Sequence, residues 1–449
     1  MKNKLFYSKK NNIYVILYTF ANMFRLTITI LLTSVFTILS AQTPKEEFAL
    51  CPDFAASNSV AYQVPTEKLT PAPKGYNVFY LSHYGRHGSR YLTKIEDYEY
   101  VLRTMRLAEE EGKLTPLGKD VQHRVTLLSE QAKNRWGDLT KIGSEQIADI
   151  SKRMVKNYPE LFQGNAHINA RSTLIPRCQL SMTAALIELT RLRPHLNYSI
   201  FASGHDLHYM NFQDKILRDS NKKYNTQSVY DEFANNHLNY DRLLNSLFND
   251  TAFIRKNVNA YQFNFYLFRL AGNIQDTDYA GKMTLWDIYT KDEIYENWQV
   301  SNVWWFLGFG FTPLNGNKQP FTQRNLIRQI IIDADDAIRG NNVNVDLRFG
   351  HDTMILPLVC LMGINGYDAS IGCLDSLVSR GWLDYKVFPM ASNIQIAFYK
   401  NKAKNNDVII KILLNEKEAS LPVKTDIAPY YHWADVKKYL LNIIDNYKE

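Results

Sequence analysis

Three short runs of apolar residues in the sequence have the length of β-strands. The first, residues 76–82 (YNVFYLS), is continuous rather than alternating, which is typical of a strand covered on both faces. Residues 198–203 and 344–349 form the other two runs, and each is followed directly by glycine. The pattern therefore predicts strands in the first, middle and last parts of the chain.

Apolar residues at helical spacing follow these runs. They predict helices over residues 97–111, 324–338 and 353–362, the last with Pro357 where proline can kink a helix. Another helix is expected to begin at Pro176. Its predicted buried face consists of Leu180, Ala184, Ile187 and Leu189.

Two predicted helix starts have similar sequences, LTPLG at 114–118 and LTKIG at 139–143. In each the threonine, Thr115 or Thr140, can cap the first turn with its hydroxyl. Pro116 would then occupy a first-turn position, where the missing N–H costs nothing. We interpret the pair as two local helix starts and not as a repeat.

The block from 205 to 300 is rich in Asn, Asp and Tyr at helical spacing and has few strand signals. Strand, turn and helix recur on both sides of it. We therefore expect an α/β fold: a core sheet with helices on both faces, interrupted by an inserted, mainly α-helical subdomain. The expected parts are 42–200 for the first core segment, 201–310 for the insertion and 311–449 for the second core segment.

The amino terminus resembles an export signal. Residues 26–40 are apolar and uncharged, five basic residues precede them, and Ala41 offers a small residue for cleavage before Gln42, although Leu39 is larger than usual. We expect residues 1–41 to be removed and the protein to be exported, to the periplasm or the cell exterior, without stable membrane insertion. Two alternatives stay open: an uncleaved membrane anchor over 13–40, and translation from Met23 instead of Met1.

The formal net charge of +7 belongs mainly to this leader. Residues 1–41 hold five of the 52 basic residues and none of the 45 acidic ones, which leaves 47 basic and 45 acidic residues in the remainder. A nearly neutral mature chain gives no reason to expect nucleic acid as a partner. Any anion site must therefore be local.

The four cysteines, Cys51, Cys178, Cys360 and Cys373, include no CxxC pair, which argues against a zinc site. An exported protein can form disulfides, and four cysteines allow three full pairings that the sequence cannot separate. Acidic, His and Cys residues show no ligand spacing elsewhere. The sequence therefore predicts neither a metal nor a cofactor.

The most informative stretch is RHGSR at 86–90, directly after the first predicted strand. Open α/β sheets bind ligands at the carboxyl ends of their strands. Arg86 and Arg90 could hold phosphate oxygens beside His87, and their charge would keep the imidazole neutral and nucleophilic. Gly88 would let the backbone come close to a ligand. The competing interpretation is a charged surface turn.

This stretch resembles the RHGxR signature of the histidine phosphatase superfamily, in particular the branch of histidine acid phosphatases and phytases. The resemblance extends from about residue 75 to at least residue 400. It implies an exported enzyme with an α/β core and an inserted helical domain. It also implies a further arginine at a helix start and a late His-Asp pair.

The further arginine is assigned to Arg177 in PRCQLS, which resembles the family's helix start, with Arg171 as the competitor. The His-Asp pair has two candidates, at 205–206 and 351–352. His351 and Asp352 follow a predicted strand and precede an apolar helix, as the family's pair does, so we prefer them and expect His205 and Asp206 to be structural. The competing interpretation of Asp352 is a plain cap of the following helix, and Asp352 could also fill both roles.

The resemblance then assigns the roles. His87 attacks phosphorus and becomes a phosphohistidine, Asp352 donates a proton to the leaving group, and the phosphoryl oxygens are held by Arg86, Arg90, Arg177 and His351. The expected partner is a small-molecule phosphate ester, and the oligomeric state is open.

The expected substrates are inositol phosphates, as for phytases or multiple inositol polyphosphate phosphatases. Tyr91 favours the latter group, but Asp352 and Thr353 stand where that group commonly has Ala and Glu. A broad-specificity or sugar-phosphate acid phosphatase is the alternative. A non-catalytic phosphate- or polyanion-binding protein is the alternative of another class.

Overall fold

The computed structural model describes residues 42–212, 214–401, 403 and 407–448. The predicted export signal, 1–41, lies outside this range. Apart from the first residues of α2 (Pro44–Leu50), everything discussed below belongs to one compact unit that begins at Phe48. None of the helices within the described ranges combines the length and apolar character needed to cross a membrane.

The strands are β1 (Asn77–Arg86), β2 (His167–Ser172), β3 (Asn197–Ala202), β4 (Val343–Gly350), β5 (Asn393–Asn401), β6 (Asp407–Leu414), β7 (Lys417–Glu418) and β8 (Tyr430–His432). The helices are α2 (Pro44–Leu50), α3 (Glu96–Glu110), α4 (Pro116–Ala132), α5 (Lys141–Asn157), α6 (Pro176–Leu192), α7 (Leu207–Met210), α8 (Lys215–Lys223), α9 (Thr226–His237), α10 (Asp241–Leu247), α11 (Thr251–Asn257), α12 (Ala260–Asn273), α13 (Lys291–Phe309), α14 (Arg324–Arg339), α15 (Asp352–Met362), α16 (Asp384–Val387) and α17 (Trp433–Asp445). The strands predicted around 76–82, 198–203 and 344–349 correspond to β1, β3 and β4.

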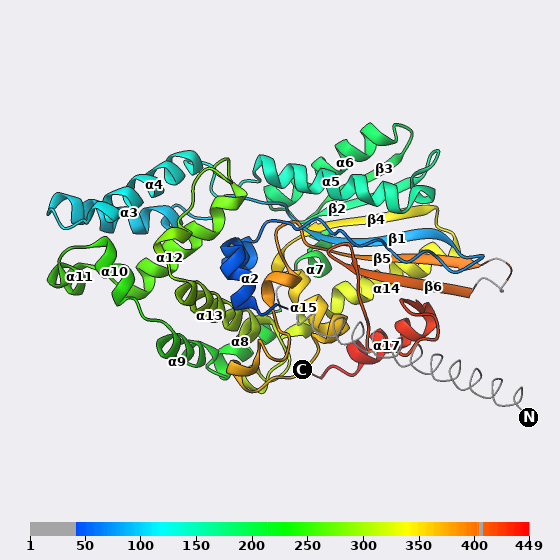
Figure 1. Cartoon of the computed structure of the whole chain (residues 1–449). Helices are drawn as coiled ribbons and strands as arrows, with labels where there is room; N and C mark the ends of the chain where they lie inside the picture. The colour runs from blue at the N-terminus through cyan, green and yellow to red at the C-terminus, as the bar shows by residue number, and fades with distance from the viewer. Residues whose placement is uncertain (1–41, 213, 402, 404–406, 449) are drawn as a thin grey trace, which may run out of the picture. The chain divides into compact units, whose positions relative to one another are not determined.

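The sheet has a parallel and an antiparallel half. Its strand order is β3-β2-β4-β1-β5-β6-β7, and β8 pairs with β6 (Figure 1). Strands β3, β2, β4 and β1 are parallel, whereas β5 and β6 run antiparallel to their neighbours. The carboxyl ends of β1, β4 and β2 therefore lie side by side, with Arg86 paired to Gly350 and Ser172 paired to Phe349.

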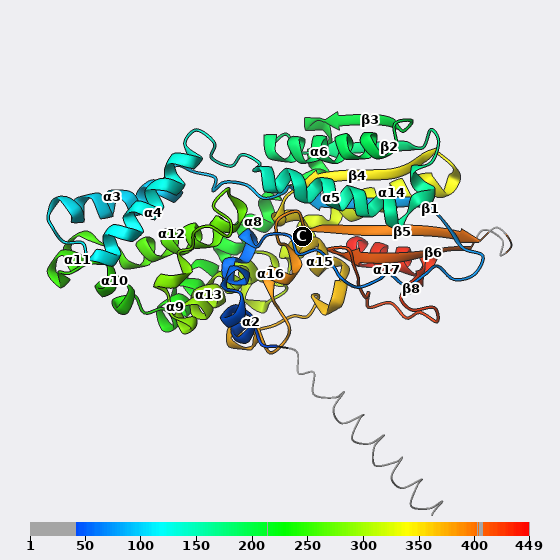
Figure 2. The same cartoon turned by 45° about the horizontal axis from the view of Figure 1, so that its top comes forward.

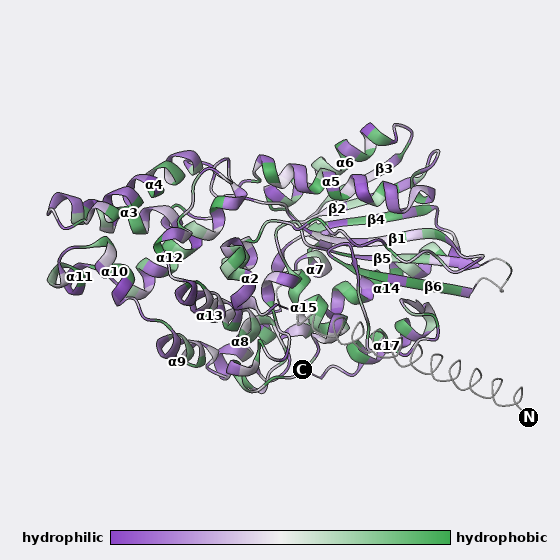
Figure 3. Cartoon of the chain, viewed as in Figure 1, coloured by the Kyte–Doolittle hydropathy of each residue, from purple (hydrophilic) through white to green (hydrophobic). Residues whose placement is uncertain are grey.

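Both faces of the sheet are covered by helices, as the continuous apolar run predicted. Along β1, Tyr80 and Tyr84 belong to a core with α14, α15 and α17, whereas Leu81 belongs to a second core with α5 and α6. Figure 2 shows α5 and α6 on one side of the strands and α17 on the other. Strand β6 is largely hydrophobic in Figure 3, in keeping with burial on both faces.

A third hydrophobic core holds the helical part together. It joins α12 and the first half of α13 to α3, α4, α10 and α11, the helices farthest from the sheet in Figure 1. Helices α7 through α13 lie within 201–310, the range of the predicted helical insertion. Helices α3 and α4, from the range expected to be the first core segment, pack with this part and not on the sheet.

The two similar helix starts are confirmed as threonine-capped. The hydroxyls of Thr115 and Thr140 accept the N–H groups of Gly118 and Gly143 at 2.9 and 3.2 Å. A Cβ on Gly118 would lie 2.2 Å from the carbonyl oxygen of Leu247. Glycine is therefore required at this helix start because another backbone segment touches the first turn.

Three expectations need correction or extension. The buried face of α6 includes Ala184 and Leu189, but Leu180 and Ile187 are 50% and 64% exposed, so their prediction was wrong. All four cysteines are free thiols. Strands β5 and β6 were not predicted, and they supply the antiparallel half of the sheet.

Candidate active site

The predicted site residues lie at one edge of the sheet, at or shortly after the carboxyl ends of three adjacent parallel strands. Arg86 is the last residue of β1 and His87 follows it. His351 and Asp352 follow the end of β4, and Arg177 lies in the first turn of α6, shortly after β2. Strand order thus brings together segments that are far apart in the sequence, in the place where open α/β sheets bind ligands.

The His87 ring has a defined tautomer. Its Nδ1 lies 2.9 Å from the carbonyl oxygen of Gly88, and the side chain is buried. Because a carbonyl oxygen can only accept, Nδ1 carries the proton of this hydrogen bond, and the lone pair is on Nε2. A neutral imidazole with a free Nε2 is the form in which histidine acts as a nucleophile.

Burial and positive charge keep His87 in that form. The pKa of His87 is lowered well below its usual value by burial and by the charges of Arg86, Arg177 and Arg90. Burial, with Arg86 and Arg177, also lowers the pKa of Arg90 to about 10. The protein therefore gathers three cations around a neutral histidine.

The three guanidinium groups hold unused donors. Arg86 donates through Nη1 to the carbonyl oxygens of Asn58 and Phe388 at 2.6 and 2.8 Å, and Arg90 donates to Tyr91 at 3.0 Å. The buried Nε atoms of Arg86, Arg90 and Arg177 have no hydrogen-bond partner within the described part of the chain. Buried donors without partners are uncommon, and three that belong to arginines whose charges act on one histidine fit an anion such as phosphate.

His351 lies beside His87. The two ring centroids are 5.9 Å apart with an interplanar angle of 71°. Nε2 of His351 lies 3.1 Å from the hydroxyl of Thr173, and burial followed by the charge of Arg177 lowers its pKa to about 4. His351 is therefore neutral at ordinary pH and can contribute one N–H donor to the same site.

Asp352 is ionised and paired in the free protein. Its Oδ2 lies 2.9 Å from Nη2 of Arg86 and accepts the Asn58 amide at 3.1 Å. Burial alone would raise the pKa of Asp352, but Arg86, this hydrogen bond and Arg90 lower it to about 2. The residue that caps α15 is His351, and Asp352 begins the helix, where Oδ1 accepts the N–H of Thr353 at 2.8 Å. The interpretation of Asp352 as a plain helix cap is thus wrong.

Gly88 makes a close contact with the backbone of Gly143. A Cβ on Gly88 would lie 2.2 Å from the carbonyl oxygen of Gly143, and a Cβ on Gly143 would lie 2.1 Å from that of Ser89. The loop after β1 thus packs directly on the first turn of α5. The small size of Gly88 therefore positions the loop that carries His87 and Arg90.

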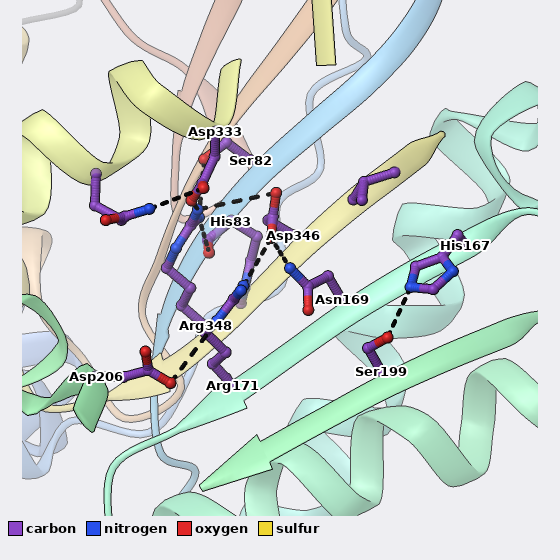
Figure 4. A network of polar contacts seen from close by, with 12 residues as sticks. Ser82, His83, His167, Asn169, Arg171, Ser199, Asp206, Asp333, Asp346 and Arg348 are labelled. Carbon is purple, nitrogen blue, oxygen red and sulfur yellow. Dashed lines mark hydrogen bonds and ion pairs between the residues drawn. The ribbon is translucent and has the colours of Figure 1, made fainter. Parts of the chain in front are cut away.

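The competing residues belong to a different network, shown in Figure 4. Arg171 on β2 lies 3.1 Å from Asp346 and 3.9 Å from Asp206. Asp346 accepts the amide of Asn169 at 2.8 Å, and Arg348 is paired with Asp333. Arg171 and Asp206 are therefore engaged in a polar network on the strands, as structural residues would be, while the His205 side chain is 85% exposed.

Several supporting residues were not predicted. Asn58, in a 3-10 helix at Pro52–Ser59, contacts both Arg86 and Asp352. The hydroxyl of Ser181 accepts the Gly88 N–H at 3.1 Å and donates to the Arg177 carbonyl at 2.8 Å. Its position one turn after Arg177 was a usable signal. The polar segment around Asn58 contains no pattern from which its contacts with the site could have been predicted.

A pocket of about 470 Å³ adjoins this cluster. Arg90 and Asp352 line it at the catalytic end, and residues of α12 and α13 line much of the remainder. Groups of three or more His, Cys, Asp or Glu side chains able to hold a metal ion do not occur in the described part of the chain.

The comparisons agree with this geometry. A family model described as histidine phosphatase superfamily (branch 2) matches residues 85–415, which include all six predicted site residues. No curated protein sequence matches the chain.

Solved structures share the fold. The multiple inositol polyphosphate phosphatase of Bifidobacterium longum in complex with inositol hexasulfate has a TM-score of 0.70 at 16% identity, covering 86% of this chain and 97% of that one. The same protein in complex with phosphate has a TM-score of 0.67 at 15% identity, covering 87% and 98%. The phytase from D. castellii has a TM-score of 0.66 at 14% identity, covering 91% and 89%.

Proposed function

Because the chain belongs to the histidine phosphatase superfamily (branch 2) and is thus a histidine-type phosphomonoesterase, we propose a double-displacement mechanism centred on His87. Nε2 of His87 attacks the phosphorus atom, and the bond from phosphorus to the ester oxygen breaks. The phosphoryl group remains on His87 until water attacks it, which releases inorganic phosphate and restores the free imidazole.

The arginines stabilise the charge that spreads over the phosphoryl oxygens. Arg86, Arg90 and Arg177 supply donors that are already desolvated and oriented, so little reorganisation is needed during the reaction. His351 adds an N–H donor. This role is supported by the unpaired Nε atoms of the three arginines around His87, and that observation carries the proposal.

Asp352 transfers the proton. In the free protein it is ionised, so it must be protonated on substrate binding. A phosphate beside it raises its pKa and competes for Arg86, and a monoester bound as the monoanion brings the required proton with it. Asp352 then donates this proton to the leaving oxygen and later accepts one from the attacking water.

We propose inositol phosphates as the substrate class. The names of the structural neighbours support it, since they include a multiple inositol polyphosphate phosphatase and a phytase. The competing class is sugar phosphates or a broad range of monoesters. Phosphate release from inositol phosphates and from sugar phosphates, measured side by side, separates the two.

Hydrolysis of p-nitrophenyl phosphate tests the activity. We expect turnover by the wild type, loss of turnover in His87→Ala, and retention in His205→Ala, a matched histidine that is exposed. Rapid quenching in base, where phosphohistidine is stable, followed by mass spectrometry should find one phosphoryl group on His87. Phosphate binding without turnover by the wild type would instead indicate a binding protein.

We further propose that the protein is exported after removal of residues 1–41. The basic residues, the apolar run at 26–40 and the small Ala41 support this. Mass spectrometry of the amino terminus of protein recovered outside the cytoplasm should find Gln42 as the first residue. Retention of the leader on membrane-bound protein would contradict cleavage.

A further inference from the structure

The pocket beside the catalytic cluster has an aromatic wall. Tyr261, Phe265 and Trp304 line it and remain 37%, 37% and 46% exposed. The rings of Tyr261 and Phe265 are stacked with centroids 6.2 Å apart, and the Tyr261 hydroxyl lies 3.1 Å from that of Tyr230. Exposed rings held in place by their neighbours offer a preformed surface to a flat or apolar group.

The same pocket has few charges. Arg90, Arg269 and Asp352 are the charged residues among the described residues that line it. Arg90 and Asp352 belong to the catalytic cluster. Arg269 lies 3.4 Å from the buried carboxylate of Asp97 and over the Phe265 ring at 5.2 Å, so its charge is already compensated. Beyond the reacting phosphate, the pocket therefore has little net positive charge.

The low net charge of the pocket restricts which leaving groups can bind in it. Each phosphate on a substrate brings nearly two negative charges, and proteins usually match such a group with Arg or Lys. A ring with several phosphates would place all but one of them against walls that are aromatic or neutral except for Arg269, which Asp97 already pairs, and unpaired charge is costly there. A ring with a single phosphate would meet donors at the catalytic end and aromatic faces elsewhere.

From this contrast, and building on the function proposed above, we propose that the pocket selects monophosphate esters whose leaving group is an uncharged ring. Trp304 and Phe265 are the specificity-determining residues that stack on that ring. Among inositol phosphates, the preferred substrates are then those with the fewest phosphates.

Two matched substrate pairs test this with the full-length mature protein. Benzyl and ethyl phosphate have similar alkyl leaving groups but differ by a ring, and we expect kcat/KM to be about tenfold higher for benzyl phosphate. Inositol monophosphate should likewise have a higher kcat/KM than inositol hexakisphosphate. Preference for the hexakisphosphate would overturn this inference and leave the proposed function standing, whereas no release from any ester would overturn both.

Substitutions in the aromatic wall test which side chains cause the preference for benzyl phosphate. Trp304→Ala should remove most of the benzyl-to-ethyl preference, mainly through KM, and Trp304→Phe should restore much of it. Phe201→Ala is the matched control, because Phe201 is 45% exposed on β3 and does not line the pocket. A benzyl-to-ethyl ratio near one in the wild type, or an undiminished ratio in both Trp304→Ala and Phe265→Ala, would overturn the assignment.

Discussion

Arg86 and Asp352 form an ion pair in which Nη2 of the guanidinium lies 2.9 Å from Oδ2 of the carboxylate. The arginine is the last residue of β1 and the aspartate the first of α15, which follows the neighbouring strand β4. The ion pair thus connects the segments that follow two adjacent parallel strands. In the mechanism proposed above, Asp352 remains an anion until phosphate competes for the arginine, which links proton transfer to substrate binding.

The role of Asp352 as proton donor predicts a dependence on the leaving group. Asp352→Asn should lower turnover of an alkyl phosphate by about two to four orders of magnitude. Turnover of p-nitrophenyl phosphate should decrease far less, because its phenolate leaves with little help from an acid. The measurement is kcat for both esters in both proteins under conditions where leaving-group departure limits the rate.

Equal losses on the two esters, when formation of the phosphoenzyme limits turnover, would show that Asp352 is not the donor. Circular dichroism should confirm that the variant remains folded. This control matters because Asn cannot replace the ion pair with Arg86.

The second prediction concerns pH. Burial and the three arginines hold the pKa of His87 well below its usual value, so the nucleophile stays neutral in weak acid. Asp352, with a pKa lowered to about 2 in the free protein, depends on a proton that arrives with the monoester monoanion. Because the second pKa of a phosphate monoester is about 6, kcat/KM for alkyl phosphates should be highest in weak acid and decrease above that pH. A plateau extending to alkaline pH would contradict this route for the proton.

The third prediction separates the two His-Asp pairs. Asp206 is held 3.9 Å from Arg171, outside the catalytic cluster, so Asp206→Asn should retain phosphatase activity within about threefold of the wild type. Asp352→Asn should lose activity on alkyl phosphates under the same conditions. If Asp206→Asn were the damaging change, the assignment of the late motif to His351 and Asp352 would be wrong.

The sequence predicted the parts of this site that depend on local order. An apolar run followed by RHGSR predicts a strand with its polar residues at the carboxyl end, and the same logic places His351 and Asp352 after β4. Register then explains why they meet, since Arg86 pairs with Gly350 across adjacent strands. A motif at a strand end can be predicted because the chain itself determines where the strand stops.

Contacts made across long stretches of chain were not predicted. Asn58 is separated by 294 residues from Asp352, and its own segment shows neither strand nor helix periodicity. The packing of Gly88 on Gly143 likewise depends on how α5 returns to the loop after β1. Hydrophobic periodicity shows which face of a helix or strand is buried, but not which other element packs against that face. For this reason, α3 and α4 were assigned to the core segment beside the sheet, although they pack with the helical part.

The fourth prediction is independence from metal ions. Three arginines surround His87, so the charge of the phosphoryl group can be balanced by side chains. Activity on p-nitrophenyl phosphate should persist after prolonged treatment with EDTA and dialysis. Loss of activity that one divalent ion restores would exclude the mechanism as proposed.

The fifth prediction concerns Asp276, which is buried beneath the catalytic loop. Its Oδ1 accepts the Ser89 hydroxyl at 2.5 Å, and Asn273 donates to both Asp276 and the Arg90 carbonyl. Burial raises the pKa of Asp276 to about 7 from 3.8, although Ser89 and Arg90 oppose the shift. Because the folded state binds this proton more tightly than the unfolded chain, the protonated carboxyl favours folding in acid, and this contribution is lost as pH rises from about 4 to 7.

Replacement by asparagine tests this directly. Asp276→Asn keeps an acceptor for Ser89 but cannot ionise, so the free energy of unfolding should change less between pH 4 and 7 than in the wild type. The difference between the two proteins should amount to a few kcal/mol, since one pKa unit corresponds to about 1.4 kcal/mol. Urea unfolding at several pH values measures it, with Asp206→Asn as the control carboxylate. If the free energy of unfolding had the same pH dependence in the wild type and in Asp276→Asn, Asp276 would be ionised across this range. The catalytic loop would then pack on a charged carboxylate.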